Sequence, residues 1–380
     1  MLNVGIIGIG NAGNQVATIA NTELSIPVIA INSSEKDLET VPSGIPKKLI
    51  SDTEGLSEGA GKDRKLAKKL LQDSIENFLT SEDVVEFMDK LDFCFIVSST
   101  GGGTGSGVSP IMTDILSKRH PDTNIILIGI LPESEEALDA QVNTLEYLNE
   151  LYKALPNQTY MLYDNDKYAG QPTYQIMEKV NKEIVGDIDV LRCSYNYTTK
   201  YNSIDNRDMT RLITFPGRIV VSRLENFKDK DCDTKTIEEM LIDNLKRNSH
   251  VEIQRDKKVM ATGVITNLSQ TLNEEFNNNI PNVREFIGSP VHSFNHIYVN
   301  EERGIGNNVF LIISGLSPIN DRIYKISDII KEMEEKQRIM EEENALSSVD
   351  LKGLTDVISD KGKDQGELNL KNIFDSFGSL

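Results

Sequence analysis

The sequence lacks the features of a membrane or secreted protein. No run approaches the roughly 20 consecutive apolar residues that a membrane-spanning helix requires. The apolar start of the chain has no basic lead and no small-residue cleavage site, so we expect a buried strand there rather than a signal peptide. The 380 residues include only 3 cysteines, which are too few and too widely spaced for a disulfide framework. These absences indicate a protein of the reducing cytoplasm.

Positive charge is also scarce. The 40 Lys and Arg residues face 59 Asp and Glu residues, which gives a formal net charge of -19. Such a surface disfavours direct binding to the phosphate backbone of nucleic acid, so a basic adaptor protein would have to make any DNA contact. Plain solubility is the alternative explanation of the charge. The length and the 38% apolar fraction allow two domains with a core, followed by a polar extension.

The first half of the chain alternates short apolar runs with amphipathic segments. This alternation predicts an α/β domain with a doubly wound parallel sheet, whose strands are covered on both faces. The predicted strands are Val4–Ile9, Pro27–Ile31, Phe93–Ser98, Ile125–Leu131 and Tyr160–Tyr163. The predicted helices lie at about residues 12–20, 62–79, 106–118 and 135–154.

A long amphipathic helix is predicted at Tyr174–Val190, and a second α+β domain follows it. The strands expected in that domain are Ile219–Val221, Ala261–Ile265, His296–Val299 and Val309–Ile313, with a helix near Thr236–Lys246. The predicted parts are a nucleotide-binding domain (1–173), a central helix (174–200), the α+β domain (201–316), a charged C-terminal helix (317–346) and a flexible acidic tail (347–380).

A glycine-rich loop follows the first strand and opens a helix. Its sequence, GIGNAGNQ at residues 8–15, fits GxGxxG, a pattern that lets a helix N-terminus approach a phosphate. Dinucleotide-binding enzymes share this pattern, but they need an Asp or Glu at the end of the second strand to hold the ribose. That strand ends here in Asn32, Ser33 and Ser34, and Glu35 comes late. An NAD(P)-dependent oxidoreductase is therefore a weakened alternative, since a His/Lys/Tyr catalytic set is also lacking.

A second glycine-rich loop decides between these hypotheses. SSTGGGTGSG, at residues 98–107, runs directly from a buried strand into an amphipathic segment. Consecutive glycines present several backbone N–H groups to one anion, hydroxyls add donors, and the following helix contributes its positive end. A flexible linker would not lie between a strand and a helix of a compact domain.

A P-loop does not fit the sequence. The nearest stretch to GxxxxGK[ST] is Gly55–Lys62, where the glycines are misplaced and Asp63 follows the lysine. Without a lysine clamp, the phosphate charge must be met by backbone dipoles and Mg²⁺.

The residues resemble the tubulin/FtsZ superfamily. GGGTGSG is the signature of tubulin and of its bacterial relative FtsZ, and GNAGNQ closely resembles tubulin's GQAGNQ. Residues 30–38 (AINSSEKDL) resemble FtsZ's AINTDAQDL, 58–64 (EGAGKDR) occupy the place of its GAGGNPxxGR, and 131–137 (LPESEEA) that of the ribose-contacting loop. The resemblance spans roughly residues 1–345. It is closest to the TubZ branch of plasmids and phages, through residues 315–330 and the acidic tail.

The resemblance implies a guanine-nucleotide site that uses GTP/GDP and Mg²⁺. The residues under the phosphates would be Gly10, Asn11, Ala12, Asn14 and Gln15. Those wrapping them would be Thr100, Gly101, Gly102, Gly103, Thr104, Gly105 and Ser106. Toward the β- and γ-phosphates and Mg²⁺ would lie Asn32, Ser33, Gly59, Ala60 and Gly61. Glu136 and Asn143 would approach the ribose, and Asn181 would pair with guanine, unless it is a plain helix-surface residue.

The catalytic residues implied by the resemblance lie elsewhere in the chain. FtsZ carries an NxDxxD loop after its central helix, and the counterpart here comprises Asn202, Asp205 and Asp208, with the asparagine displaced by one. The spacing of the aspartates puts both carboxylates on one side of a helical turn. They can orient the attacking water when this loop docks on the nucleotide of the next subunit. The alternative is that they only cap a helix.

The implied function is a tubulin-like GTPase that polymerises head-to-tail into dynamic filaments and hydrolyses GTP at the junctions. The TubZ resemblance adds segregation of plasmid or phage DNA, through a small DNA-binding adaptor held by the C-terminal tail, without direct contact to nucleic acid or membrane. The tail ends in apolar residues spaced as a docking helix, at Leu370, Ile373, Phe374 and Phe377. The alternatives are a frayed terminus, an FtsZ-like division or phage-positioning filament, and a non-hydrolysing homologue.

A zinc site is not predicted. His292 and His296 are four residues apart, but their surroundings indicate a loop leading into a strand, and no cysteine or carboxylate completes a zinc ligand set.

Overall fold

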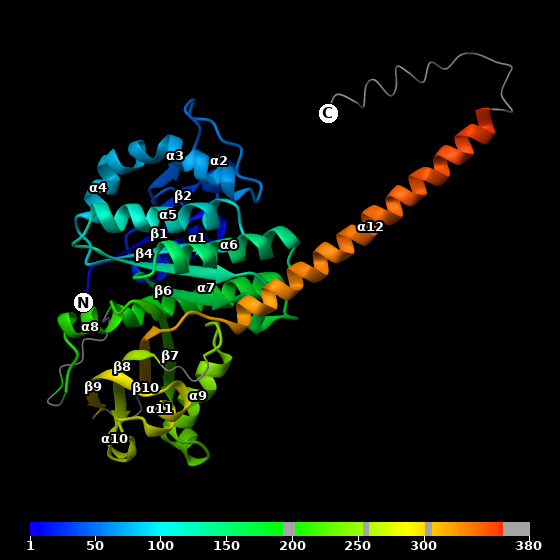
Figure 1. Cartoon of the computed structure of the whole chain (residues 1–380). Helices are drawn as coiled ribbons and strands as arrows, with labels where there is room; N and C mark the ends of the chain where they lie inside the picture. The colour runs from blue at the N-terminus through cyan, green and yellow to red at the C-terminus, as the bar shows by residue number, and fades with distance from the viewer. Residues whose placement is uncertain (193–198, 200–201, 254–257, 301–305, 360–380) are drawn as a thin grey trace. The chain divides into compact units, whose positions relative to one another are not determined.

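The computed structural model describes residues 1–192, 199, 202–253, 258–300 and 306–359, with side chains described as far as residue 342. The chain divides into two units, Met1–Ser327 and a second one from Asp328 onward. Every strand of the described residues belongs to the first unit (Figure 1).

A parallel sheet forms the first half of this unit, in the order β3-β2-β1-β4-β5-β6. Its strands are β1 (Val4–Ile9), β2 (Val28–Asn32), β3 (Lys47–Leu49), β4 (Phe93–Ser99), β5 (Asn124–Leu131) and β6 (Thr159–Asp164). All except the edge strand β3 are almost entirely buried, as their continuous apolar sequences require. The predicted doubly wound α/β class is confirmed.

Helices cover both faces of the parallel sheet. α1 (Gly10–Leu24) and α7 (Thr173–Leu191) pack together on one face, and α5 (Thr104–Arg119) and α6 (Leu138–Ala154) pack on the other, with α3 (Arg64–Thr80) against α5. From β1 the chain crosses to β2, toward the β3 edge of the sheet. From β4 it crosses to β5, in the opposite direction. Right-handed crossovers then place α1 and α5 on opposite faces. The ligand crevice of such a sheet lies where the direction changes, between β1 and β4.

Four more strands continue the same sheet in the order β7-β10-β8-β9. They are β7 (Gly217–Phe227), β8 (Val259–Ser269), β9 (Pro290–Asn300) and β10 (Asn307–Leu316). β7 joins β6 through two residue pairs only, whereas β10 is antiparallel to both β7 and β8. A separate apolar cluster lies between these strands and α9 (Ile237–Arg247), α10 (Gln270–Glu275) and α11 (Pro281–Ile287). This second cluster lies in the region that was predicted as a second α+β domain, within the unit Met1–Ser327.

Some predicted boundaries differ from the structure. The central helix was expected over 174–200, but α7 ends at Leu191, where the Arg192 guanidinium bonds Asp189 and the Leu24 carbonyl. The sequence also did not predict the short helices α2 (Glu35–Glu39), α4 (Glu82–Met88) and α8 (Asn206–Ile213).

The C-terminal helix is longer than the predicted 317–346. α12 begins at Asp321 and continues to Ser359. Pro318 lies in the segment before the helix, and a proline disfavours helical conformation in the residue that precedes it. Residues 347–359, the start of the predicted flexible tail, are therefore helical. Gly353 lies within this stretch, and a single glycine costs a helix only about 1 kcal/mol. The predicted docking residues Leu370, Ile373, Phe374 and Phe377 lie outside the described residues.

The part of α12 in the second unit carries ion pairs along its own surface. Arg338 bonds Glu335 and Glu342, and Lys331 bonds Asp328, all three or four residues apart. None of the helices described is long and apolar enough to cross a lipid bilayer.

Candidate nucleotide-binding site

The two glycine loops meet at the carboxyl edge of the parallel sheet. β1 and β4 are neighbours in register, so the residues that follow them emerge side by side. Gly10 has a φ of 73°, and a Cβ there would lie 3.2 Å from the Gly105 nitrogen. A Cβ on Gly13 would lie 2.1 Å from the Val97 oxygen, because α1 presses directly against β4. These contacts explain why both loops need glycine.

The second glycine loop, residues 98–107, is held by its hydroxyl groups. Thr100 donates its N–H to the Ile130 carbonyl (2.9 Å), and its Oγ1 lies 3.0 Å from the Thr144 Oγ1 on α6. Ser98 and Ser109 share a buried hydroxyl bond of 2.8 Å. By contrast, a Cβ on Gly102 would meet no atom within 4 Å. These bonds hold one side of the loop in place. On its other side, at Gly102 next to the N-terminus of α5, the loop borders open space.

The Gly59–Lys62 segment packs against this loop. Gly59, Gly61 and Lys62 all have positive φ, and the Lys62 backbone lies within 2.9 Å of a Cβ position on Gly103. The Asn143 Nδ2 donates to Lys62 O (2.9 Å), to Gly101 O (3.1 Å) and, at 3.4 Å, to Gly102 O. Asn143 was predicted to approach the ribose; its described contacts show that its amide joins two loops.

Arg64 also fixes the loop and was not among the predicted site residues. Its side chain is 2% exposed and donates from Nη2 to the Ser106 carbonyl at 2.9 Å. Glu146 and Glu150 of α6 pair with the same guanidinium. Its partners are 42 to 86 residues away in the sequence, so no local pattern could reveal this role.

The end of β2 joins the same site. Ser33 Oγ lies 2.6 Å from the Thr104 Oγ1, and the buried Asn32 accepts the Ser33 N–H through Oδ1. The Asn32 Nδ2 donates to Asp37 Oδ2 at 3.3 Å. Hydroxyl, amide and carboxylate oxygens are therefore gathered beside the second glycine loop.

A cavity of about 420 Å³ opens between α1 and the start of α7. Asn11, Asn14, Gln15 and Asn181 line it, and Asn181 Nδ2 lies 3.4 Å from Gln15 Oε1. Tyr174 also lines it and is 67% exposed, which is unusual for a large aromatic side chain. Tyr174 was not among the residues predicted from the sequence, where its place near the start of the long helix was the available signal. The cavity combines an aromatic face with amide groups.

Glu136 lies in the loop after β5, as expected, but its described contact is internal. Its Oε1 accepts the Glu133 N–H at 3.2 Å. Burial and the charges of Glu136, Asp166 and Glu135 raise the pKa of Glu133 above its usual value. This loop therefore already holds closely spaced acidic groups.

The predicted catalytic residues lie at the opposite end of the first unit. α7 extends for 19 residues, about 28 Å, from the cavity to Arg192, whose carbonyl accepts the Leu2 N–H before β1 begins. α8 follows, and its end lies near the first residue of β6, where Thr159 Oγ1 donates to the Phe215 carbonyl. The glycine loops occupy the carboxyl ends of these strands.

Asp205 caps α8, since its Oδ1 accepts the Asp208 N–H at 2.8 Å. Asp205 is exposed and Asp208 is half-buried, whereas Asn202 is tied by its carbonyl to the Ile297 N–H (2.9 Å). His296 lies in β9 and accepts the Ile204 N–H through Nδ1, and His292 stacks on Phe215. The aspartates and the glycine loops cannot meet within one subunit.

Residues 3–171 match the Tubulin/FtsZ family, GTPase domain. The tubulin-like protein CetZ of Pyrococcus horikoshii is 27% identical over 184 residues, which are 47% of this chain and 50% of that protein. The tubulin-like protein TubZ of Clostridium botulinum C phage is 23% identical over 221 residues, 57% of this chain and 58% of that protein. The chain spans about half the length of the curated relatives it matches.

The fold is shared over a longer stretch. The crystal structure of a GTPγS-form protofilament of Bacillus thuringiensis serovar israelensis TubZ superposes with a TM-score of 0.73 at 17% identity, covering 91% of this chain and 94% of that one. The likeness therefore includes the β7–β10 half, which lies beyond the family match.

Proposed function

We propose that this chain, whose residues 3–171 match the Tubulin/FtsZ family GTPase domain, polymerises head-to-tail and hydrolyses GTP at the junctions between subunits. One observation carries the proposal. The phosphate-binding loops lie at the carboxyl edge of the sheet, and Asp205 with Asp208 lies at the amino edge. A head-to-tail junction brings the two halves of one site together.

In this proposal the backbone holds the phosphates. The N–H groups of residues 101–105 and the N-termini of α1 and α5 meet the negative charge. The 420 Å³ cavity receives the guanine, which stacks on Tyr174 and pairs with Asn181. A base with the wrong hydrogen-bonding edge would leave that amide unpaired.

The oxygen donors around β2 suit Mg²⁺, which prefers oxygen ligands and binds with substrate phosphates. Ser33, Thr104 and the Asn32–Asp37 pair are the residues that would hold it beside the phosphates. When bound, the ion would neutralise charge on the phosphate oxygens.

The incoming subunit contributes two carboxylates. Asp205 and Asp208 would orient the attacking water and accept its proton as the γ-phosphate is cleaved. Cleavage then depends on assembly, and bound GTP marks the subunits that joined last.

Asp205→Asn and Asp208→Asn test the catalytic role. Asparagine caps a helix as well as aspartate does, so Asp205→Asn keeps the bond to the Asp208 N–H and removes only the charge. We expect GTP binding and assembly to persist, phosphate release to fall by about 10²-fold or more, and the polymer to last longer.

Thr236→Ala is the matched control, because Thr236 caps α9, away from the proposed junction. It should lower stability by about 1 kcal/mol and leave turnover per assembled subunit unchanged. Wild-type turnover in both aspartate variants would refute the catalytic role.

We further propose that the filament segregates plasmid or phage DNA through a basic adaptor protein bound by residues 360–380. The net charge of -19 supports an adaptor over direct DNA contact. Filaments of the full chain, sedimented from extract of the native host, should carry a small DNA-binding protein together with DNA, and filaments ending at Ser359 should carry neither. Recovery of division proteins without DNA would favour the FtsZ-like alternative.

A further inference from the structure

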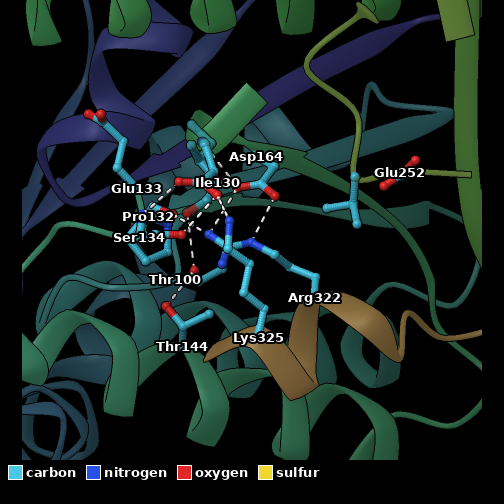
Figure 2. Close-up of polar contacts among 12 residues, drawn as sticks. Thr100, Ile130, Pro132, Glu133, Ser134, Thr144, Asp164, Glu252, Arg322 and Lys325 are labelled. Carbon is cyan, nitrogen blue, oxygen red and sulfur yellow. Dashed lines mark hydrogen bonds and ion pairs between the residues drawn. The ribbon is translucent and has the colours of Figure 1, made fainter. Parts of the chain in front are cut away.

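The first turns of α12 reach the loops beside the glycine loops. β5 and β6 are parallel neighbours whose final residues, Leu131 and Asp164, are paired in register. The segments that follow them therefore emerge at the same edge as the glycine loops. Residues 132–137, here called the β5 loop, lead directly into α6. Figure 2 shows Arg322 and Lys325 of α12 beside both segments.

Arg322 joins three parts of the chain. Its Nε donates to Asp164 Oδ2 at 2.8 Å, and its Nη2 donates to the Pro132 carbonyl at 2.7 Å and to Asp164 Oδ1 at 3.2 Å. Both side chains of this ion pair are at least nine-tenths buried. Burial raises the pKa of Asp164 above its usual value, and Arg322 opposes that rise. Arg322 thus offsets part of the cost of burying this carboxylate.

Lys325 makes a parallel connection one helical turn further on. Its ammonium pairs with Asp166, whose carboxylate also accepts the Ser134 N–H and the Ser134 hydroxyl, each at 2.8 Å. Burial would raise the pKa of Asp166, but Lys325 and Ser134 outweigh burial and lower it. Lys325 is 54% exposed, so this connection is the more accessible of the two.

The β5 loop is connected to the second glycine loop through α6. Gly101 packs on Ala140 so tightly that a Cβ there would lie 3.1 Å from the Ala140 Cβ. Three residues further along α6, Asn143 bonds the carbonyls of Lys62 and Gly101. A shift of Pro132 or Ser134 would therefore move the helix that supports the second glycine loop.

From these contacts we propose that Arg322 and Lys325 are positioning residues for nucleotide binding, through which the C-terminal helix sets how long the nucleotide is retained. The proposal rests on the guanine-nucleotide site proposed above. Neither side chain touches the nucleotide: both act on the β5 loop and, through α6, on the glycine loop. Anything that binds α12 and draws its first turns away would loosen the nucleotide.

The test measures the release of a fluorescent GTP analogue from the full chain, kept too dilute to assemble. Lys325→Met should release it about fivefold faster, at the lower end of usual coupling between sites, and the melting temperature should change little because the Lys325 side chain is 54% exposed. Lys325→Arg should restore the wild-type rate. Arg322→Lys keeps the charge but lacks the fork that bonds Asp164 and Pro132 together, and should also release faster.

Lys331→Met is the matched control. Lys331 lies on the same helix, is 71% exposed and pairs only with Asp328 among the contacts described for it. Release at the wild-type rate from Lys325→Met and Arg322→Lys, or equal acceleration by Lys331→Met, would overturn the inference. If wild-type protein failed to bind the analogue at all, the proposed function would fail instead, so the two failures are distinguishable.

Discussion

Glycine has two separate uses at this site, and the space around each residue tells them apart. At Gly13 a side chain would strike the backbone of β4, 2.1 Å from the Val97 oxygen. At Gly102 a side chain would enter open space on the side where the phosphates are expected. The first glycine allows the fold, and the second keeps the ligand volume free.

Alanine at these two positions should therefore give opposite results. Gly13→Ala should lower the free energy of unfolding by several kcal/mol, because backbone cannot move aside as a flexible side chain can. Gly102→Ala should leave the unfolding midpoint in urea unchanged and weaken GTP binding by at least about tenfold. Equal loss of stability in both variants would contradict this distinction.

The sequence revealed the residues whose role is local and missed those whose partners are distant. Both glycine loops could be predicted, because a strand, a glycine run and a helix follow one another directly. Arg64 and Arg322 could not, since the carbonyls they hold are 42 and 190 residues away. Asn143 was predicted as a site residue, yet the contact of its amide with two loops needed the tertiary structure.

At the scale of elements, the long buried strands were predictable and the short edge elements were not. β1 and β4 are continuous apolar runs, so their burial on both faces leaves a clear signal. β3 reads Lys47-Lys48-Leu49, is only half-buried and pairs only with β2, so its sequence carries no such signal. The C-terminal helix was placed correctly, but its end was misjudged because polar composition was taken for disorder.

α7 is the element that links the two proposed half-sites, and one contact fixes it to the β7–β10 half. Arg223 of β7 donates to Asp187 of α7 at 2.8 Å, and Asp187 also bonds His250 and Tyr163. The guanidinium lies over Gly186, where a Cβ would stand 2.2 Å from its Nη1. The glycine thus makes room for the ion pair.

Gly186→Ala should destabilise the protein although alanine favours helix. The better helix propensity contributes about 1 kcal/mol, whereas the shift of the flexible Arg223 side chain loosens its charged hydrogen bond to Asp187, which costs about 1.5–3 kcal/mol. We expect a net loss of about 0.5–2 kcal/mol in urea unfolding. Gly44→Ala is the control, because a Cβ there meets no atom within 4 Å, and a stability loss confined to Gly186→Ala supports the account.

At the scale of the whole molecule, the proposed function depends on the distance between its two half-sites. Each subunit presents the phosphate loops at one edge of its sheet and Asp205 with Asp208 at the other. In the proposed function, chemistry that needs both edges occurs between molecules, so turnover would depend on assembly.

The most direct measurement is the rate of phosphate release per subunit over a wide range of protein concentration, with assembly followed by light scattering in the same samples. The account predicts GTP-bound but nearly inactive subunits at high dilution, and turnover that rises only where scattering begins. Turnover per subunit that stays constant down to concentrations without polymer would contradict the shared active site.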